Sequence, residues 1–146
     1  MFVNRFFAPD QSATSQLASD LAAFLVREGF EVEALASDQR IDGASSFYRE
    51  HSEESGVRVT RLSGTRFGRR SVAGRILDYC SFLLCARREI RRRVRPEDVL
   101  ILMTDPPLLH GLFPEHPRQI HWHQDVFPDT AVAAGLLTPG SWPVRI

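Results

Sequence analysis

Two segments late in the chain share one form, a short apolar run that ends abruptly in polar, proline-bearing residues. Residues 99–103 lead into the Thr-Asp-Pro-Pro sequence of residues 104–107, and residues 119–122 lead into the polar residues 123–128. Short apolar runs bounded by turn residues are typical of fully buried parallel strands. Because ligands in open α/β sheets bind just beyond the carboxyl ends of such strands, these polar tails are the first places to look for function.

Two helices are predicted from apolar side chains that recur with the helical period. The first begins at a cap formed by Thr14 or Ser15 and ends at Gly29. The side chains expected on its apolar face are Leu17, Leu21, Phe24 and Leu25. The second covers residues 71–94 and is stopped by Pro96. The side chains expected on its apolar side are Val72, Ile76, Tyr79, Leu83 and Leu84.

Strand-like segments separate these helices and determine the fold class. Further strands are predicted over residues 1–7, 30–36 and 57–62, a loop over residues 38–55, and a last helix near residues 130–137. This order implies right-handed crossovers. The chain is therefore predicted to be α/β, with a Rossmann-like, mostly parallel sheet flanked by helices. Its 146 residues, 43% of them hydrophobic, are enough for one domain with a real core but too few for two.

The net charge of the chain is zero, but its arginines are clustered. Ten of them lie from Arg66 to Arg95, against Asp78 and Glu89. A basic surface beside an apolar helix can hold anionic lipid or phosphate, and the alternative is a solvated helix face. The arginines considered for such a contact are Arg66, Arg69, Arg70 and Arg75. Because the chain shows no nucleic-acid motif, nucleic acid is not an expected partner.

No stretch of the sequence approaches the roughly 18 consecutive apolar residues of a membrane span, and the longest candidate covers residues 79–86. The N-terminus also lacks a charged segment followed by a long apolar one. Cys80 and Cys85 are five residues apart in a helical pattern, which puts them on different faces, so no disulfide is expected. We therefore expect a cytoplasmic protein, with a peripheral position on the inner face of the plasma membrane as a further option.

Five segments of the chain, in order, carry a resemblance to a known family. They are residues 3–14, 56–59, 67–79, 104–107 and 122–128, which contain Val-Asn-Arg-Phe-Phe-Ala-Pro-Asp, Gly-Val-Arg-Val, Phe-Gly-Arg-Arg-Ser, Thr-Asp-Pro-Pro and Trp-His-Gln-Asp-Val-Phe-Pro. Together they resemble the N-terminal domain of family 4 glycosyltransferases. The most similar branch is the bacterial one that builds O-antigen, capsule and exopolysaccharide sugars, and the resemblance covers nearly the whole chain.

The resemblance implies a two-domain enzyme of the GT-B fold. Such an enzyme transfers a sugar from a nucleotide diphosphate donor to an acceptor, with retention at the anomeric carbon and without a metal or other cofactor. In that architecture residues 1–146 would be a single, apparently incomplete acceptor-side domain, and a donor-binding half or separate subunit would be its partner. Acceptors in this branch are polyprenyl-diphosphate-linked or other saccharides, so an anionic membrane surface is a further expected partner.

Three departures from the family pattern favour an alternative. Residues 1–146 do not contain the donor-binding half that the family carries. The first strand starts closer to Met1 than the family's first strand does. The connection from Thr104 to Gln119 holds four prolines, where the family places a longer helix. The alternative is a non-catalytic, membrane-associated or degenerate fragment of such an enzyme.

The second polar tail supplies the candidate catalytic residues. Asp125 aligns with the acidic residue that the family places after this strand, where it would accept the acceptor's proton or orient its hydroxyl group. His123 is the second candidate base, because the unperturbed pKa of histidine lies near neutrality. The alternative is that both side chains cap a strand end and bind backbone.

The same tail also resembles a metal site. His121, His123 and Asp125 follow the spacing of the HxHxD pattern of metallo-hydrolases. That pattern normally continues with a histidine, and Val126 stands there instead. A metal-dependent hydrolase is therefore a minor alternative, and no metal ligands are assigned.

Residues for acceptor binding are expected at one helix start and two strand ends. Asp10 and Thr14 lie in the loop before the first helix, where backbone N–H groups could face a phosphate. A simple capping loop is an equal alternative, because the chain lacks the glycine that the family usually carries there. Thr104, Asp105 and Gln124 could bind acceptor hydroxyl groups, unless the prolines beside the first two serve only to stop the strand.

Overall fold

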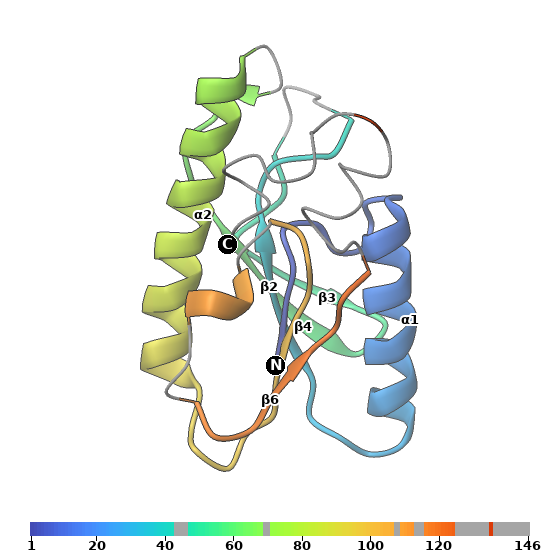
Figure 1. The fold of residues 1–146 in the computed structure, drawn as a ribbon. Coiled ribbons are helices and arrows are strands. Elements are labelled where there is room, and N and C mark those ends of the chain that lie inside the picture. The colour runs from blue at the N-terminus through green and yellow to red at the C-terminus, as the bar shows by residue number, and fades with distance from the viewer. Residues whose placement is uncertain (43–46, 69–70, 107–108, 113–115, 125–134, 136–146) are drawn as a thin grey trace.

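A six-stranded sheet lies between two long helices in the computed structural model, which describes residues 1–42, 47–68, 71–106, 109–112, 116–124 and 135 (Figure 1). The strands are β1 (Phe2–Val3), β2 (Glu33–Ser37), β3 (His51–Glu54), β4 (Val57–Leu62), β5 (Leu100–Leu102) and β6 (Gln119–His121), and the helices are α1 (Ala13–Arg27) and α2 (Val72–Arg93). All neighbouring strands among these six are parallel except β3 and β4. The predicted α/β class, a mostly parallel sheet flanked by helices, is confirmed.

The strand order β3-β4-β2-β1-β5-β6 places the first strand inside the sheet. From β1 the chain crosses through α1 to β2 on one side, and from β4 it crosses back through α2 to β5 on the other side of β1. The two helices cover opposite faces of the sheet (Figure 1). The winding direction therefore reverses between β1 and β5, and ligands of open α/β sheets bind outside the carboxyl ends of the strands at such a switch point.

Helix α1 contacts the sheet through small side chains. Its N-cap is Ser12, whose side chain accepts a hydrogen bond from the Ser15 N–H at 3.0 Å, and not Thr14 or Ser15 as predicted. Its buried residues are Ser15, Ala18 and Ala22. Leu17 and Phe24 are 49% and 47% exposed, so the predicted apolar face is wrong for these two. Small side chains let the helix pack closely on the sheet, which the apolar period alone does not indicate.

Helix α2 runs close to its predicted bounds, and the Ser71 side chain caps it by accepting a hydrogen bond from the Gly74 N–H. Its buried residues recur every four positions and are Gly74, Asp78, Phe82, Ala86 and Ile90. Val72, Ile76 and Leu84, predicted to face the core, are each more than half exposed. The predicted face is wrong there because a glycine and a buried carboxylate occupy core-facing positions that an apolar count cannot find.

Several strands differ from their predictions. β1 covers only Phe2–Val3 of the predicted residues 1–7. β3 lies inside residues 38–55, predicted as a loop, and pairs antiparallel with β4. Its residues are polar and exposed or half-exposed, so it carries no apolar signal. β2 begins at Glu33 and not at residue 30. β5 is buried throughout, but Ile120 of β6 is 53% exposed, so β6 is not the fully buried strand predicted.

Two apolar clusters, one on each face of the sheet, hold the helices. The cluster beneath α1 includes Phe2, Phe7, Ala18, Val57 and Val59, and the cluster beneath α2 includes Val3, Leu35, Phe82, Leu100 and Leu102. Successive residues of β1 thus face opposite layers, as the period of a strand requires. In its described part, the connection between β5 and β6 holds one short 3-10 turn, Leu109–Leu112.

The two cysteines of α2, Cys80 and Cys85, are free thiols, in agreement with the prediction from their spacing. In the part of the chain that the structure describes, no helix combines the length and the apolar character needed to cross a membrane.

Candidate functional site

A crevice of about 230 Å³ lies at the switch point, outside the carboxyl ends of β1 and β5. Its lining residues are Arg5 and Phe6 after β1, Asp105 after β5, Gly68 before α2, and Arg75 and Tyr79 in the first two turns of α2. We call it the switch-point crevice. Residues from three distant parts of the chain converge there, at the place where α/β sheets bind ligands.

Arg5 is held in the switch-point crevice by backbone and by aromatic rings. Its N–H donates to the carbonyl oxygen of Asp105 at 2.7 Å. Its guanidinium carbon lies 4.8 Å from the ring centroid of Tyr79 and 5.1 Å from that of Phe6. One guanidinium nitrogen, Nη2, donates to Gln39 Oε1 at 3.2 Å. The side chain therefore presents a positive charge in a defined position.

Arg75 supplies a second positive charge from the N-terminal end of α2. Its side chain is exposed and forms no hydrogen bond or ion pair with any other residue that the structure describes. The helix dipole disfavours a cation at this end and favours cations at the C-terminal end, where α2 carries Arg91, Arg92 and Arg93. Folding therefore gives no reason for Arg75 in this position.

Asp78 fixes the loop that borders the crevice. Its carboxylate is buried and accepts hydrogen bonds from the Phe67 N–H at 3.0 Å, the Gly68 N–H at 2.9 Å and the Thr65 hydroxyl at 2.8 Å. Three donors compensate the buried charge. The loop before α2 is thereby tied to the first turns of the helix, next to Arg75.

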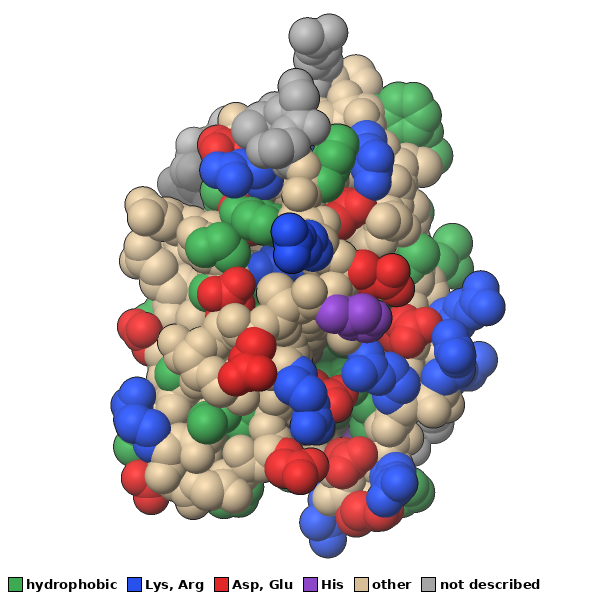
Figure 2. Space-filling view, turned by 180° about the vertical axis from the view of Figure 1, so that it is seen from behind, with side chains coloured by type: hydrophobic (Ala, Val, Ile, Leu, Met, Phe, Trp, Pro, Cys, Tyr) green, Lys and Arg blue, Asp and Glu red, His purple; other side chains and the backbone are tan. Residues whose placement is uncertain are grey.

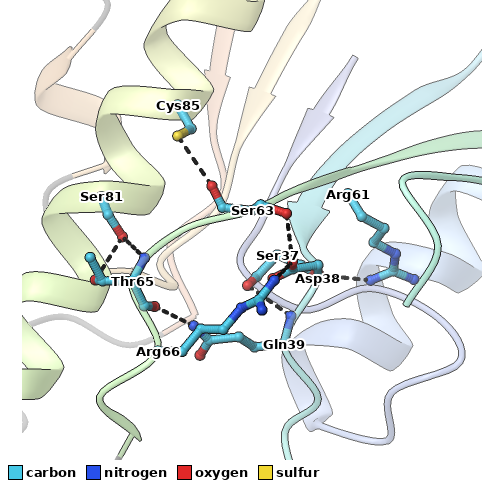
Figure 3. A network of polar contacts seen from close by, with 9 residues as sticks. All are labelled: Ser37, Asp38, Gln39, Arg61, Ser63, Thr65, Arg66, Ser81 and Cys85. Carbon is cyan, nitrogen blue, oxygen red and sulfur yellow. Dashed lines mark hydrogen bonds and ion pairs between the residues drawn. The ribbon is translucent and has the colours of Figure 1, made fainter. Parts of the chain in front are cut away.

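A second polar network surrounds Asp38, between the ends of β2 and β4 (Figure 3). Its buried Oδ2 accepts hydrogen bonds from the Ser63 hydroxyl and from Arg66 Nη2, both at 2.7 Å. Its Oδ1 is buried without a hydrogen-bond partner among the described residues. The Arg66 guanidinium also lies over the Phe47 ring, 3.8 Å from its centroid. Arg66, predicted to contact a membrane or phosphate, thus has its charge paired within the protein.

Asp10 anchors the loop that follows β1. It is 7% exposed, and its Oδ1 accepts hydrogen bonds from the Ile41 N–H at 3.0 Å and the Tyr48 hydroxyl at 3.2 Å. The buried Arg61 guanidinium lies 4.5 Å from the Tyr48 ring centroid and donates to the carbonyl oxygen of Phe7. Burial lowers the pKa of Arg61, although Asp10 opposes this, and burial followed by the charge of Asp10 raises the pKa of Tyr48.

The loop before α1 caps itself with its own side chains. Thr14 Oγ1 lies 3.1 Å from Ser12 Oγ, the atom that accepts the Ser15 N–H. The Ser15 hydroxyl donates to the carbonyl oxygen of Asp10 at 2.9 Å. The geometry matches the capping alternative, with Asp10 and Thr14 as parts of the cap, and leaves their acceptor-binding role a prediction.

Two other residues predicted to bind the acceptor carry buried polar atoms without partners. Thr104 Oγ1, after β5, and both side-chain amide atoms of Gln124, after β6, have no hydrogen-bond partner among the described residues. β5 and β6 are parallel neighbours, so these groups follow adjacent strands at the same edge of the sheet. An unsatisfied buried polar group costs about 1–3 kcal/mol, which a bound hydroxyl group could recover.

The remaining predicted residues are only partly covered. Asp125, Arg69 and Arg70 lie outside the described residues, as does the helix predicted near residues 130–137 except for position 135. His123 is exposed, and its ring meets that of His121 edge to face with centroids 6.2 Å apart. Within the described ranges no group of three or more His, Cys, Asp or Glu residues could hold a metal ion. The HxHxD alternative stays untested, because its aspartate is not among them.

The residues of the switch-point crevice that sequence reasoning missed include Arg5 and Tyr79. Each was assigned only to a strand or a helix face, and the contact between them joins positions 74 residues apart in the chain. The one local signal was an arginine directly after the first apolar run, where the carboxyl end of a strand was already expected.

Two larger hollows lie elsewhere on the molecule. One of about 720 Å³, which we call the amino-edge cavity, is lined by Met1, Phe30, Val99 and Ile120 together with charged residues of both signs. The other, of about 700 Å³, lies between α2 and the β3–β4 pair. Seen from behind, the molecule shows acidic and basic side chains interspersed (Figure 2). Such mixed, mutually paired charge is typical of a solvated surface.

No protein-family model matches the chain, and neither a curated protein nor a solved structure does. What the chain does must therefore be argued from the switch-point crevice and the polar groups beside it.

Proposed function

We propose that this chain is the acceptor-binding side of a GT-B glycosyltransferase that builds bacterial cell-surface polysaccharide. The proposal rests on the resemblance of its five segments and on a sheet topology compatible with that architecture. The observation that carries it is the convergence of Arg5, Arg75 and Asp105 on the switch-point crevice.

Unsatisfied polar groups beside the crevice support a sugar-like acceptor. Thr104 Oγ1 and the Gln124 amide are buried and lack partners in the described part of the chain. Sugar hydroxyl groups donate and accept hydrogen bonds, so they can satisfy both a hydroxyl and an amide at once. In this proposal the acceptor saccharide lies over the ends of β5 and β6.

Asp125 is the proposed catalytic residue, with His123 as the second candidate. A carboxylate next to the attacking hydroxyl would orient it and accept its proton as the bond to the anomeric carbon forms. This role rests on the sequence resemblance, because Asp125 lies outside the described residues. The donor sugar would come from a donor-binding domain that completes the cleft.

The test is sugar transfer by the chain together with a donor-binding GT-B domain, supplied on the same polypeptide or separately. Labelled nucleotide sugars are offered with a polyprenyl-diphosphate-linked saccharide, and label in the extracted lipid is measured. We expect transfer by the unaltered chain, loss of transfer in Asp125→Asn, and no change in the control Asp20→Asn, an exposed aspartate of α1. Undiminished transfer by Asp125→Asn would remove Asp125 from the mechanism.

The outward face of α2 favours a second candidate, a non-catalytic domain that binds anionic membranes. Val72, Ile76 and Leu84 are 73%, 54% and 69% exposed on this face. Arg88 and Arg91, one and two turns beyond Leu84, extend it with positive charge. An apolar strip continued by arginines suits the interface of an anionic bilayer.

Sedimentation with vesicles separates the two candidates. Binding to phosphatidylglycerol-containing vesicles that weakens with salt and in Leu84→Glu, but not in the control Gln16→Glu on α1, supports membrane contact. If such binding occurs while no donor domain yields transfer, the non-catalytic candidate holds. If the protein binds neutral and anionic vesicles equally, the charge argument is wrong.

A further inference from the structure

The switch-point crevice contains more positive charge than the fold requires. The guanidinium groups of Arg5 and Arg75 line it, and the Asp105 carboxylate is the acidic side chain among its lining residues. Asp105 itself already takes part in a contact within the protein. The balance of charge in the crevice therefore favours an anionic ligand.

The two guanidinium groups come from different elements and are prepared to different degrees. Arg5 is fixed by the Tyr79 and Phe6 rings and by Gln39, so little of its side-chain entropy remains to be lost on binding. Arg75 is exposed and has no partner in the described structure, so all five of its N–H donors can turn to a ligand. One rigid and one adaptable cation face the same space.

The volume of the crevice and the number of N–H donors that line it indicate which class of anion fits. One guanidinium fork satisfies a carboxylate, whereas a phosphate group has three oxygens that two forks can share. A volume of about 230 Å³ far exceeds the ~30 Å³ occupied by one water molecule and has room for one phosphate group or two linked ones. The rings of Phe6 and Tyr79 also hold the Arg5 guanidinium, a planar group with several N–H donors, at the crevice.

We propose that the switch-point crevice is a binding site for a phosphate or diphosphate group, with Arg5 and Arg75 as its two ligating residues. This inference deepens the proposed function, because it gives the acceptor a phosphate-bearing end held below the reacting sugar. It rests on that function only for the identity of the acceptor. Binding of the anion itself needs neither a donor domain nor Asp125.

Titration calorimetry of the full 146-residue chain with inorganic pyrophosphate tests the site. We expect saturable binding that weakens about ten-fold or more in Arg75→Ala and in Arg5→Ala, since each removes a charge-assisted contact. The matched control is Arg88→Ala, which removes an equally unpartnered, exposed arginine from the same helix outside the crevice. It should leave the affinity unchanged.

A second variant guards against loss of folding. If Arg5→Ala unfolds, as judged by circular dichroism, Arg75→Gln carries the test, because Arg75 is exposed and supports no contact of the described fold. The proposal is overturned if pyrophosphate does not bind the folded protein. It is equally overturned if Arg88→Ala weakens binding as much as Arg75→Ala, which would indicate unspecific attraction.

Vesicles distinguish a lipid-borne phosphate from a free one. Phosphatidylcholine vesicles with and without polyprenyl phosphate are sedimented with the protein, and pyrophosphate is added as competitor. Retention only on the polyprenyl phosphate vesicles, lost with pyrophosphate and in Arg75→Ala, supports the site with a lipid source. Pyrophosphate binding without such retention supports it with a soluble source.

The transfer assay keeps the two proposals apart. Pyrophosphate binding that depends on Arg5 and Arg75, with no sugar transfer by any donor pairing, leaves the anion site standing and removes the proposed function. Sugar transfer by a folded protein that does not bind pyrophosphate leaves the proposed function standing and removes the anion site.

Discussion

The two edges of the sheet differ in whether their charged side chains are paired within the protein. At the amino edge, Glu33 bridges Arg58 at 3.0 Å and Arg93 at 3.3 Å beside the apolar lining of the amino-edge cavity. At the carboxyl edge, Arg75 lines the switch-point crevice without a partner among the described residues, and Thr104 Oγ1 is buried without one. The Glu33 cluster at the amino edge pairs its charges internally, whereas the carboxyl edge leaves the Arg75 guanidinium and Thr104 Oγ1 without partners in the described structure.

This difference teaches that cavity size is a poor guide to the site here. The amino-edge cavity, at about 720 Å³, is some three times larger than the switch-point crevice at about 230 Å³. Four of its charged lining residues, however, form ion pairs with one another that folding itself explains, namely Glu31, Glu33, Arg58 and Arg93. Open charges and unsatisfied polar atoms reduce stability, so a ligand gives a better reason for them than the fold does.

The largest effect is expected from Asp78→Ala, which breaks the support of the carboxyl edge. The change leaves the Phe67 and Gly68 N–H groups without their acceptor, so we expect a loss of about 3 kcal/mol or more in the free energy of unfolding. Urea denaturation measures it. Glu89→Ala is the control, because it removes an ion pair between Glu89 and the exposed Arg92 of the same helix. It should lower the free energy of unfolding by no more than ~0.5 kcal/mol. Equal losses would mean that the two edges do not differ as argued.

A pH-dependent effect is expected from Tyr48, which joins the Asp10 network of the carboxyl edge. Burial and Asp10 raise the pKa of Tyr48 above its ordinary value of 10.0, so the folded state holds this proton more tightly than the unfolded state does. The associated stability is fully present below pH 10 and is lost as the pH rises through the folded-state pKa. Tyr48→Phe should cost about 1 kcal/mol at neutral pH and should lessen the alkaline loss.

Denaturation at neutral and at alkaline pH measures both quantities. Tyr79→Phe is the matched control, because it removes the other tyrosine hydroxyl of the chain and keeps the ring beside Arg5. If the loss of stability at alkaline pH vanished in Tyr79→Phe and persisted in Tyr48→Phe, its assignment to Tyr48 would be contradicted.

Local patterns in the sequence account for most of the fold. The alternation of residues 57–62 gives β4 with its observed bounds, and Ser71 and Pro96 bracket α2. The same patterns fail for β3, because an exposed edge strand needs no apolar residues. Helical periodicity located α1 and α2 but not all of the side chains that they bury, because Leu17, Phe24, Val72, Ile76 and Leu84 are exposed.

The site is less predictable, because its residues are fixed by contacts between distant segments. Asp78 is buried although it is charged, since backbone N–H groups of a loop ten and eleven residues earlier compensate it. Arg5 reaches Tyr79 across the sheet end, a contact without a local signature. Strand ends such as Thr104 and Asp105 were found because topology alone, without side-chain detail, determines where parallel strands end.

A smaller effect of opposite sign sharpens the comparison. Thr104→Val replaces a buried hydroxyl that has no partner among the described residues, so the free energy of unfolding should stay the same or rise by up to ~1 kcal/mol. Sugar transfer should nevertheless fall. In the control Thr60→Val, the lost hydroxyl accepts a hydrogen bond from Arg93 Nη1 at 2.8 Å, so stability should drop by about 1 kcal/mol. Destabilisation by Thr104→Val would show that the hydroxyl serves the fold.

The smallest effect is expected at the amino edge, from Glu33→Gln. The change removes both ion pairs of Glu33, but Arg58 is 59% exposed and Arg93 is 33% exposed, so solvent screens these pairs. Thermal unfolding at low salt should show a loss of about 0.5 kcal/mol or less, which shrinks further at high salt. Pyrophosphate affinity should not change, because the charges removed lie at the opposite edge of the sheet from Arg75. A fall in affinity comparable to that of Arg75→Ala would mean that the anion binds through the overall field of the protein, and the distinction between the two edges would then lose its functional meaning.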